Sequence, residues 1–377
     1  MWSSSYAFHL EKILVEMLSK PAISIVMPCH NRSYDLIKTL QAYDAQLSQE
    51  PFELIAIDDA SEDGTCKLLT SYEPINYSLR IGRNERNMGP ATARNLGVSL
   101  ADAPIILFVG DDIVPHPRLV SGHLLAHRIH SKREIAILGR VMWANDLPVN
   151  TLMTHIDGVG AQQFSFYYLK DGKEYDYRHL YTANVSLKRE FLTSQEKLFD
   201  TDFQYAAFED AELGYRLFKA GLSIIYLSLL IGFHYHYHNI WTFSERMYRA
   251  GLMACLLVQK HPETRLKILG RNWSRRLASW KIKSAFQTGS LEQTLSIEEQ
   301  ILQLSSNYEW SSHPLLDELY LKVLTCYFFK GVIYGIFKNT PTAIKIHNQC
   351  VNEFLVPLVN KLMQESERLG MKPNNAL

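Results

Sequence analysis

The chain has 377 residues and carries 39 basic and 39 acidic side chains, so its formal net charge is zero. Hydrophobic residues make up 47% of it and charged residues 21%, which is typical of a globular protein long enough for two domains. A neutral chain has no overall positive field, so we expect no nucleic acid among its partners.

Two features bear on where the protein works. The first 20 residues mix polar side chains with apolar ones at helical spacing, which predicts an amphipathic helix over residues 1–20 rather than a signal peptide. The five cysteines are scattered and form no CxxC pair. This argues against a zinc site or a disulfide framework and favours a cytoplasmic location.

The first half of the chain alternates apolar, β-rich runs with helical patterns. The predicted strands are Ile23–Met27, Phe52–Ile57, a run near Tyr77–Ile81, and Ile105–Val109. Helical patterns follow the first three of them. This order is typical of an α/β fold with a doubly wound, mostly parallel sheet and flanking helices, in which ligands bind beyond the carboxyl ends of the strands.

Two acidic pairs stand where predicted strands end. Asp58 and Asp59 follow the second strand, and Asp111 and Asp112 follow the fourth after Gly110. Because the ends of parallel strands share one edge, both pairs are expected to face a single crevice. Adjacent carboxylates repel each other unless a cation lies beside them, and Mg²⁺ and Mn²⁺ take oxygen ligands that they share with substrate phosphates. The alternative for the second pair is a solvated turn that caps the next helix.

Two further clusters of polar residues lie in the second half. Glu209 and Asp210 open a predicted helix, where carboxylates also complement the helix dipole. His234, His236 and His238 alternate with tyrosines, so an extended segment would place the three imidazoles on one face. Such a face suits metal or phosphate binding.

Membrane contact is a separate question for the second half. Residues 220–244 contain no Asp, Glu, Lys or Arg, but their glycines and histidines favour a buried strand and its exit loop over a span. Residues 260–283 hold eight Lys or Arg against one acid. They can rest on anionic lipid, hold an anionic acceptor, or form a solvated face packed on the preceding domain. Leu315–Lys338 is predicted to be a packed or amphipathic helix.

Seven motifs occur in a fixed order along the chain. They are Ile25–Arg32, Ile57–Thr65, Asn87–Asn95, Phe108–Asp112, Thr182–Ser186, Phe208–Asp210 and His234–His236. Together they resemble the family 2 glycosyltransferases of the bacterial type, which are inverting, nucleotide-sugar-dependent enzymes with the GT-A fold. The resemblance implies a Rossmann-like GT-A domain over residues 21–250, followed by a helical C-terminal region over residues 251–377.

The resemblance implies a nucleotide site at the ends of the first strands. Its residues are Pro28, Asn31, Arg32, Asp58, Asp59, Arg94 and Asp111. Asp59, with Asp58 as the second candidate, would hydrogen-bond the base, typically uracil. Arg94 would support the diphosphate side of the crevice.

The resemblance also implies a site for a divalent cation, Mn²⁺ or Mg²⁺. Asp112, aided by Asp111, would meet the metal and the ribose, and His234 or His236 would complete the site. The family's metal motif is often Asp-X-Asp, and Gly110 takes the place of its first acid here. Asp111 is therefore the weaker candidate.

The implied reaction is the transfer of a sugar from a nucleotide diphosphate sugar, first of all a UDP-sugar, to a hydroxyl of a glycan, lipid-linked or protein acceptor. Asp210 would be the general base, because the acceptor hydroxyl must lose a proton on the face opposite the leaving group. Glu209 beside it would raise the pKa of Asp210 by like-charge repulsion. Expected partners are the donor, a glycan or lipid-linked acceptor, the inner face of a membrane through residues 260–283, and a second copy of the chain.

Two other functions compete with this one. A sugar-phosphate nucleotidyltransferase needs a glycine-rich phosphate loop near its N-terminus, whereas here the first strand leads into Pro28–Arg32 without a glycine. A sugar-nucleotide-binding protein that kept the fold and lost turnover is the non-enzymatic alternative. The presence of both Asp112 and Asp210 argues against it.

Overall fold

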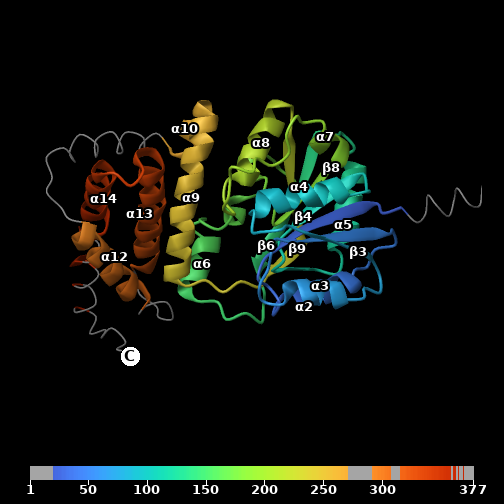
Figure 1. Cartoon of the computed structure of the whole chain (residues 1–377), viewed down its shortest axis with the longest axis horizontal. Coiled ribbons are helices and arrows are strands. Elements are labelled where there is room, and N and C mark those ends of the chain that lie inside the picture. Colours follow the sequence, from blue (N-terminus) through green and yellow to red (C-terminus); the bar gives the residue numbers. More distant parts are fainter. Residues whose placement is uncertain are drawn as a thin grey trace, which may run out of the picture. The chain divides into compact units, whose positions relative to one another are not determined.

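The computed structural model describes residues 20–270, 291–306 and 315–357, with residues 360, 361, 364 and 368, and of residues 291–297 and 304 it describes the backbone alone. It divides into two compact units (Figure 1). Of the described residues, the sheet unit comprises 20–147, 168–204 and 209–236, and the helical unit comprises the others. The helix predicted over residues 1–20 and most of the basic stretch 260–283 lie outside the described residues.

The sheet unit contains nine strands and most of the short helices. Its strands are β1 (Ile23–Cys29), β2 (Phe52–Asp58), β3 (Ser78–Arg83), β4 (Ile105–Val109), β5 (Ile113–Pro115), β6 (Ile135–Trp143), β7 (Glu174–Tyr175), β8 (Asn184–Lys188) and β9 (Ser223–His234). Its helices are α2 (Leu36–Asp44), α3 (Thr65–Ser71), α4 (Pro90–Leu100), α5 (Leu119–Ile129), α7 (Arg189–Thr193) and α8 (Glu209–Lys219), with a 3₁₀ turn at Tyr177–His179.

The strand order of the sheet is β3-β2-β1-β4-β8-β6-β9-β5, and β7 pairs with β9. The first four strands in this order are parallel, as the sequence predicts. The rest of the sheet is mixed, because β8 runs antiparallel to both β4 and β6, and β5 runs antiparallel to β9. The prediction of a mostly parallel sheet rests on a helix between successive strands, and that alternation ends after β4.

Helices cover both faces of the parallel part of the sheet. On one face, alternate residues of β1 pack in a buried core with α2 and α5, among them Ile25, Met27 and Leu40. On the other face α4 lies close to the sheet, since a Cβ at Gly97 would come 2.5 Å from a methyl carbon of Val26. Burial on both faces explains why these strands are continuous apolar runs. Their carboxyl ends form one edge, which carries the polar residues described below.

The helical unit is built from α6 (Thr151–Asp157), α9 (Ile240–Lys260), α10 (Arg265–Ile268), α12 (Leu291–Ser306), α13 (Leu316–Phe337) and α14 (Pro341–Phe354), with 3₁₀ turns at Phe166–Tyr168, which straddles the unit boundary, and Pro262–Thr264. The domain boundary predicted at residue 250 falls inside α9. A helix is one rigid element, and α9 packs along its length on α13. The structure therefore places the boundary between residues 236 and 237 and assigns residues 148–167 to the helical unit.

Small residues bring α9 and α13 together. A Cβ at Gly251 would lie 1.9 Å from the carbonyl oxygen of Phe328, and one at Gly331 would lie 2.0 Å from that of Tyr248. Within the described residues, α13 has the length and composition of a helix that can cross a membrane, and 56% of its most apolar window is buried in the structure. Helices in a protein core can share that composition, so the feature is weak evidence for a span.

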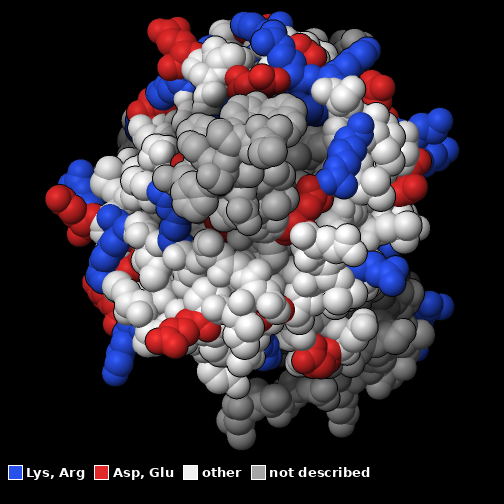
Figure 2. Space-filling model, turned by 90° about the vertical axis from the view of Figure 1, so that its right-hand side faces the viewer, with Lys and Arg blue, Asp and Glu red and all other residues white. Residues whose placement is uncertain are grey.

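Acidic and basic side chains are interspersed over the face of the molecule in Figure 2. This distribution agrees with the equal numbers of the two kinds in the chain.

Candidate active site

Asp58 and Asp59 lie at the carboxyl edge of the sheet, where the sequence predicts them. The carboxylate of Asp59 accepts the backbone N–H groups of Met88 at 2.9 Å and Gly89 at 2.8 Å, and the side-chain amide of Asn84 at 2.7 Å. The carboxylate of Asp58 is fully buried, accepts the N–H of Ser61 at 3.0 Å and lies 3.4 Å from Arg83. Both side chains thus hold loops at the carboxyl edge of the sheet. Their contact with a nucleotide base stays a prediction.

The turn after β1 supports the same edge. Asn31 has a φ of 53°, in the left-handed region, and its side-chain oxygen accepts the N–H of Glu62 at 2.9 Å. The N–H of His30 donates to Asp111 at 3.2 Å. Pro28, which lies within β1, precedes this turn. The motif from Pro28 to Arg32 therefore links the ends of β1, β2 and β4, and its contact with a nucleotide stays a prediction.

Asp112, His234 and His236 form a cluster that can hold a metal ion. Their potential ligand atoms all lie within 4.8 Å of one another. A carboxylate oxygen of Asp112 is 3.0 Å from Nδ1 of His236 and 3.5 Å from Nε2 of His234. The backbone fixes this proximity, because Ile113 pairs with His234 and the N–H of Tyr235 donates to the carbonyl of Asp112 at 2.9 Å.

Arg32 places a positive charge within this cluster. Its Nη2 donates to Asp112 at 3.0 Å and to Nδ1 of His236 at 2.6 Å, and its Nε lies 3.6 Å from Asp111. Arg32 thus brings a cationic side chain against both Asp112 and His236. One carboxylate and two imidazoles are a set of donors that can hold a divalent metal ion.

The two aspartates after β4 differ in pKa. Burial, and then the neighbouring charge of Asp112, raise the pKa of Asp111 to about 7. Burial also acts to raise the pKa of Asp112, but His234, His236 and Arg32 outweigh it and hold that pKa well below its usual value. The negative charge of the pair therefore resides on Asp112, the residue that touches both imidazoles.

The second acidic pair opens α8. Nη1 of Arg94 donates to Glu209 at 2.8 Å, and both side chains are buried. Burial, and then the charge of Glu209, raise the pKa of Asp210 to about 7, while Arg94 opposes the rise. The residue before the pair, Phe208, has a φ of 64°, an uncommon conformation for an aromatic residue that is found at functional sites.

The placement of Arg94 adds to the sequence prediction. Its guanidinium lies against Glu209 and over the ring of Phe199 at 5.5 Å, beside the expected general base. Its role at a diphosphate stays a prediction, and the structure gives it a second role as the counter-charge of Glu209.

The three-histidine face is corrected by the structure. Alternation holds only while a strand is extended, and β9 ends at His234. His236 remains within reach of Asp112, but the described cluster does not include His238. The ring of His238 packs edge-on against Phe243 at 5.1 Å within the helical unit.

Trp143, the last residue of β6, belongs to none of the sequence motifs and yet contacts the site. Its ring stacks on His234 with the centroids 5.0 Å apart and the planes 9° from parallel. Nearby, the hydroxyl of Tyr235 donates to Asp146 at 2.6 Å. The sequence alone shows Trp143 as an aromatic residue at the end of an apolar run. It does not show that Trp143 contacts His234, because that residue belongs to a strand far along the chain.

Comparison with known proteins finds a family that part of the chain resembles. Residues 24–194, somewhat less than half of the chain, match the model of the family described as glycosyl transferase family 2. The chain is 27% identical over 246 residues to the uncharacterized glycosyltransferase YfnE of Bacillus subtilis, covering 53% of this chain and 61% of that one. It is 33% identical over 108 residues to a validoxylamine A glucosyltransferase of Streptomyces hygroscopicus, covering 28% and 26% of the two chains.

The chain thus spans less than two thirds of the length of these relatives. Among solved structures, the mannosyltransferase PcManGT from Pyrobaculum calidifontis, crystallised with GDP-mannose and Mn²⁺, superposes with a TM-score of 0.53. The match has 14% sequence identity and covers 85% of this chain and 88% of that one. This likeness confirms the predicted α/β fold of the GT-A type with a helical C-terminal region.

Proposed function

We propose that the protein is an inverting glycosyltransferase that moves a sugar from a nucleoside diphosphate sugar, with UDP-sugars as the first candidates, to a hydroxyl of a glycan, lipid-linked or protein acceptor. The observation that carries this proposal is the cluster of Asp112, His234 and His236, with Arg32 among them, at the carboxyl edge of the sheet in a chain whose residues 24–194 match family 2. Ligands of doubly wound sheets bind at that edge. The named relatives are glycosyltransferases, which supports the same class of reaction.

Asp112, His234 and His236 would hold the divalent cation. When bound, a cation of this kind stabilises the charge that develops on a diphosphate leaving group. Arg32 is the cationic side chain next to this position, and its five N–H donors suit diphosphate oxygens. The guanidinium can therefore exchange its contacts with Asp112 and His236 for contacts with the donor.

Asp210 would act as the general base. In a single displacement the anomeric C–O bond to the diphosphate breaks while a C–O bond to the acceptor forms, and the acceptor hydroxyl gives its proton to the carboxylate of Asp210. A pKa of about 7 suits this task, because the group is ionised at neutral pH and still basic enough to take the proton. Arg94 pairs with Glu209, which leaves the neighbouring Asp210 as the carboxylate that would take the proton.

Turnover and donor choice are tested together. The protein is incubated with UDP-, GDP- and dTDP-sugars in the presence of Mn²⁺, Mg²⁺ or EDTA, and the released nucleoside diphosphate is measured. We expect release from a UDP-sugar with metal and none with EDTA. Calorimetry with UDP and with GDP, each with and without Mn²⁺, separates binding from turnover. Equal binding with and without Mn²⁺ would contradict the proposed role of the metal. A preference for GDP would contradict the proposed choice of a UDP-sugar.

The competing functions make different predictions in the same experiment. Tight binding of a sugar nucleotide without release from any donor, with and without candidate glycan acceptors, would identify a binding protein that lacks turnover. Formation of a sugar nucleotide from a nucleoside triphosphate and a sugar phosphate would identify a nucleotidyltransferase. We expect neither, because the chain has Asp112 within the segment that matches family 2 and Asp210 after it.

The cytoplasmic location, the dimer and the contact of residues 260–283 with a membrane stay predictions. Of this basic stretch the structure describes residues 260–270. Sedimentation with anionic vesicles at low salt tests the contact, and a protein that stays in the supernatant would end that part of the proposal.

A further inference from the structure

The side chain of Asn184 joins the two parts of the chain that form the metal cluster. Asn184 is the first residue of β8, which lies between β4 and β6, and it is fully buried. Its backbone pairs with Val109, the last residue of β4, three residues before Asp112. Its side-chain amide donates to the carbonyl of Arg140 in β6 at 3.1 Å and to that of Leu230 in β9 at 2.8 Å.

These two carbonyls flank an irregularity in the sheet. The pairing of β6 with β9 jumps from Leu227 to Ile231 on β9 while β6 advances by one residue, from Gly139 to Arg140. Bulges of this kind bend a strand and re-aim the side chains that follow, and they recur next to active sites. Four residues after Leu230 comes His234. The amide of Asn184 therefore clamps the bulge that sets the direction of the histidine.

Gly139 makes room for this clamp. A Cβ at position 139 would lie 2.3 Å from the side-chain nitrogen of Asn184 and 2.5 Å from the carbonyl oxygen of Leu230. No side chain fits in that space without moving one of the two. The glycine and the asparagine thus serve the same local structure, and neither is explained by the metal cluster or the general base.

A chain of buried hydrogen bonds fixes the orientation of the amide. Because its nitrogen donates to two carbonyls, its oxygen must accept, so Nε2 of His123 donates to it at 3.0 Å. Nδ1 of His123 then accepts from the hydroxyl of Ser186 at 2.8 Å. The hydroxyl oxygen in turn accepts from Nε2 of His127 at 2.8 Å, and Nδ1 of His127 accepts from Lys188 at 3.3 Å. Each hydrogen bond in this series therefore has one possible donor and one possible acceptor.

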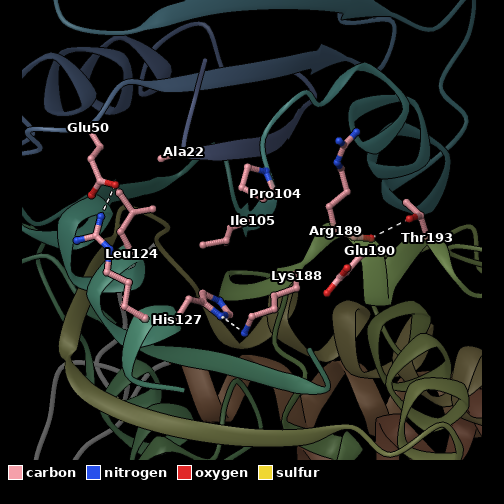
Figure 3. Close-up of a pocket in the computed structure, with 11 residues that line it drawn as sticks. Ala22, Glu50, Pro104, Ile105, Leu124, His127, Lys188, Arg189, Glu190 and Thr193 are labelled. Atoms are coloured by element: carbon pink, nitrogen blue, oxygen red, sulfur yellow. Dashed lines mark hydrogen bonds and ion pairs between the residues drawn. The ribbon is translucent and has the colours of Figure 1, made fainter. Parts of the chain in front are cut away.

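The series of hydrogen bonds ends at Lys188, beside a cavity of about 740 Å³ near the start of β1 and β4 (Figure 3). Lys188 and His127 line it, and Lys188 also donates to the carbonyls of His130 at 2.9 Å and Lys132 at 2.8 Å. The cavity holds acids as well as bases, including the ion pair of Arg128 with Glu50, so its charge selects no ligand class. Solvent in this cavity can reach Lys188 and His127, whereas His123 and Ser186 are fully buried.

We propose that Asn184 is a positioning residue of the metal site, with the chain of His123, Ser186, His127 and Lys188 holding its amide in the orientation that clamps the bulge. Asn184 touches neither metal nor substrate. It acts by fixing the backbone between the bulge and His234 relative to the end of β4. The inference rests on the proposed function for the identity of the ion, but the clamp itself is a property of the sheet.

The test compares Asn184→Asp with Val185→Ala. The aspartate keeps the shape of the side chain and removes both N–H donors, whereas Val185 lies on the same strand, is fully buried and points to the opposite face. Calorimetry with Mn²⁺ in the presence of UDP should show about 10- to 100-fold weaker metal binding in Asn184→Asp, the usual cost of losing a partner behind a ligand. We expect Val185→Ala to bind Mn²⁺ like the wild type even if its melting temperature falls as far.

A second measurement does not need the metal. Hydrogen exchange of the backbone amides of residues 231–234 should be at least about tenfold faster in Asn184→Asp than in the wild type, and unchanged in Val185→Ala. If the aspartate variant fails to fold, Ser186→Ala removes the middle of the chain and should weaken Mn²⁺ binding in the same direction. Wild-type metal affinity and exchange in the Asn184 variant would overturn the inference, as would equal losses in Val185→Ala. A wild-type protein that does not bind Mn²⁺ contradicts the proposed function instead, and the exchange measurement then decides on the clamp.

Discussion

Two acidic pairs of the sheet unit, Asp111 with Asp112 and Glu209 with Asp210, consist alike of adjacent carboxylates but have different electrostatic surroundings. Asp111 and Asp112 follow a buried strand and face two imidazoles and a guanidinium, with 3.0 Å between Asp112 and the nearest of each kind. Glu209 and Asp210 open a helix and face one buried arginine, Arg94, which contacts Glu209 at 2.8 Å. Asp112 of the first pair contacts a guanidinium and an imidazole, whereas the one cationic partner of the second pair is engaged by Glu209.

This difference assigns the roles. Partners that are charged or donate hydrogen bonds hold the pKa of Asp112 well below its usual value, so Asp112 carries the negative charge of its pair. Burial and the neighbouring Glu209 raise the pKa of Asp210 to about 7, so it can both lose and regain a proton. A permanently ionised carboxylate suits a metal ligand, and a carboxylate poised near neutral pH suits a general base. The positions of the neighbouring charged groups, rather than the two adjacent acids themselves, therefore distinguish the metal ligand from the general base.

The largest expected effect comes from removing the base. We expect Asp210→Asn to lower kcat by about 10³-fold, because a neutral amide cannot take the proton of the acceptor, and general base catalysis contributes about 10²- to 10⁴-fold. Binding of UDP with Mn²⁺ should change little. Initial rates of transfer and calorimetry of the variant measure the two quantities. Asp202→Asn, an exposed aspartate of the same unit, is the matched control. Loss of nucleotide binding in Asp210→Asn would make Asp210 a ligand and undo the comparison.

The next effect separates the members of the first pair. Asp112→Asn removes the charge that both imidazoles and Arg32 contact, so we expect Mn²⁺ to bind at least about 100-fold more weakly. Losing a residue that only supports a ligand costs about 10- to 100-fold, and losing a ligand itself should cost no less than the upper value. Asp111→Asn keeps the shape of a group whose pKa is already raised to about 7, and its metal affinity should stay within about threefold of the wild type. Titration with Mn²⁺ in the presence of UDP tests both variants. The division between the two aspartates is wrong if both substitutions weaken metal binding equally.

Part of this comparison could be predicted from the sequence. Parallel strands end at one edge, so the apolar runs before Asp58 and before Asp111 were enough to place the two pairs that follow them at one edge of the sheet. The helix that opens at Glu209 was equally visible in the pattern. Both predictions depend on strands and helices that local sequence patterns reveal, and on a topology that has few alternatives.

The remaining features depend on contacts between distant segments. The pair of Arg94 with Glu209 joins residues 115 positions apart and requires α4 to pack beside α8. Asn184 meets its carbonyls because β8 enters the sheet antiparallel, after the alternation of strand and helix has ended. His238 leaves the face of His234 and His236 because β9 ends at His234. No local pattern encodes these three outcomes, since each is decided by how one element packs on another.

The pH dependence of the wild type tests the raised pKa of Asp210. A general base acts in its ionised form, so below a pKa of about 7 the value of kcat/KM should fall about tenfold for each pH unit, and above it the value should level off. Asp112 has its pKa well below this range and should add no second step near neutral pH. Rates at saturating Mn²⁺ between pH 5 and pH 9, with donor and acceptor varied separately, give the profile. A flat profile from pH 5 upward would place the pKa of the base near its usual value.

Glu209→Gln should move that profile by a smaller amount and in a defined direction. The substitution removes the negative charge that raises the pKa of Asp210, and it leaves the positive charge of Arg94, which lowers that pKa, without its partner. Both changes favour the ionised form of Asp210, so the midpoint of kcat/KM should move to lower pH by about one unit, which corresponds to about 1.4 kcal/mol. At pH 6 the variant should therefore keep a larger fraction of its own maximal rate than the wild type does. Val185→Ala, which leaves the charges unchanged, should keep the wild-type midpoint. An unchanged midpoint would show that burial alone raises the pKa of Asp210, and a midpoint that moves to higher pH would contradict the role given to Glu209.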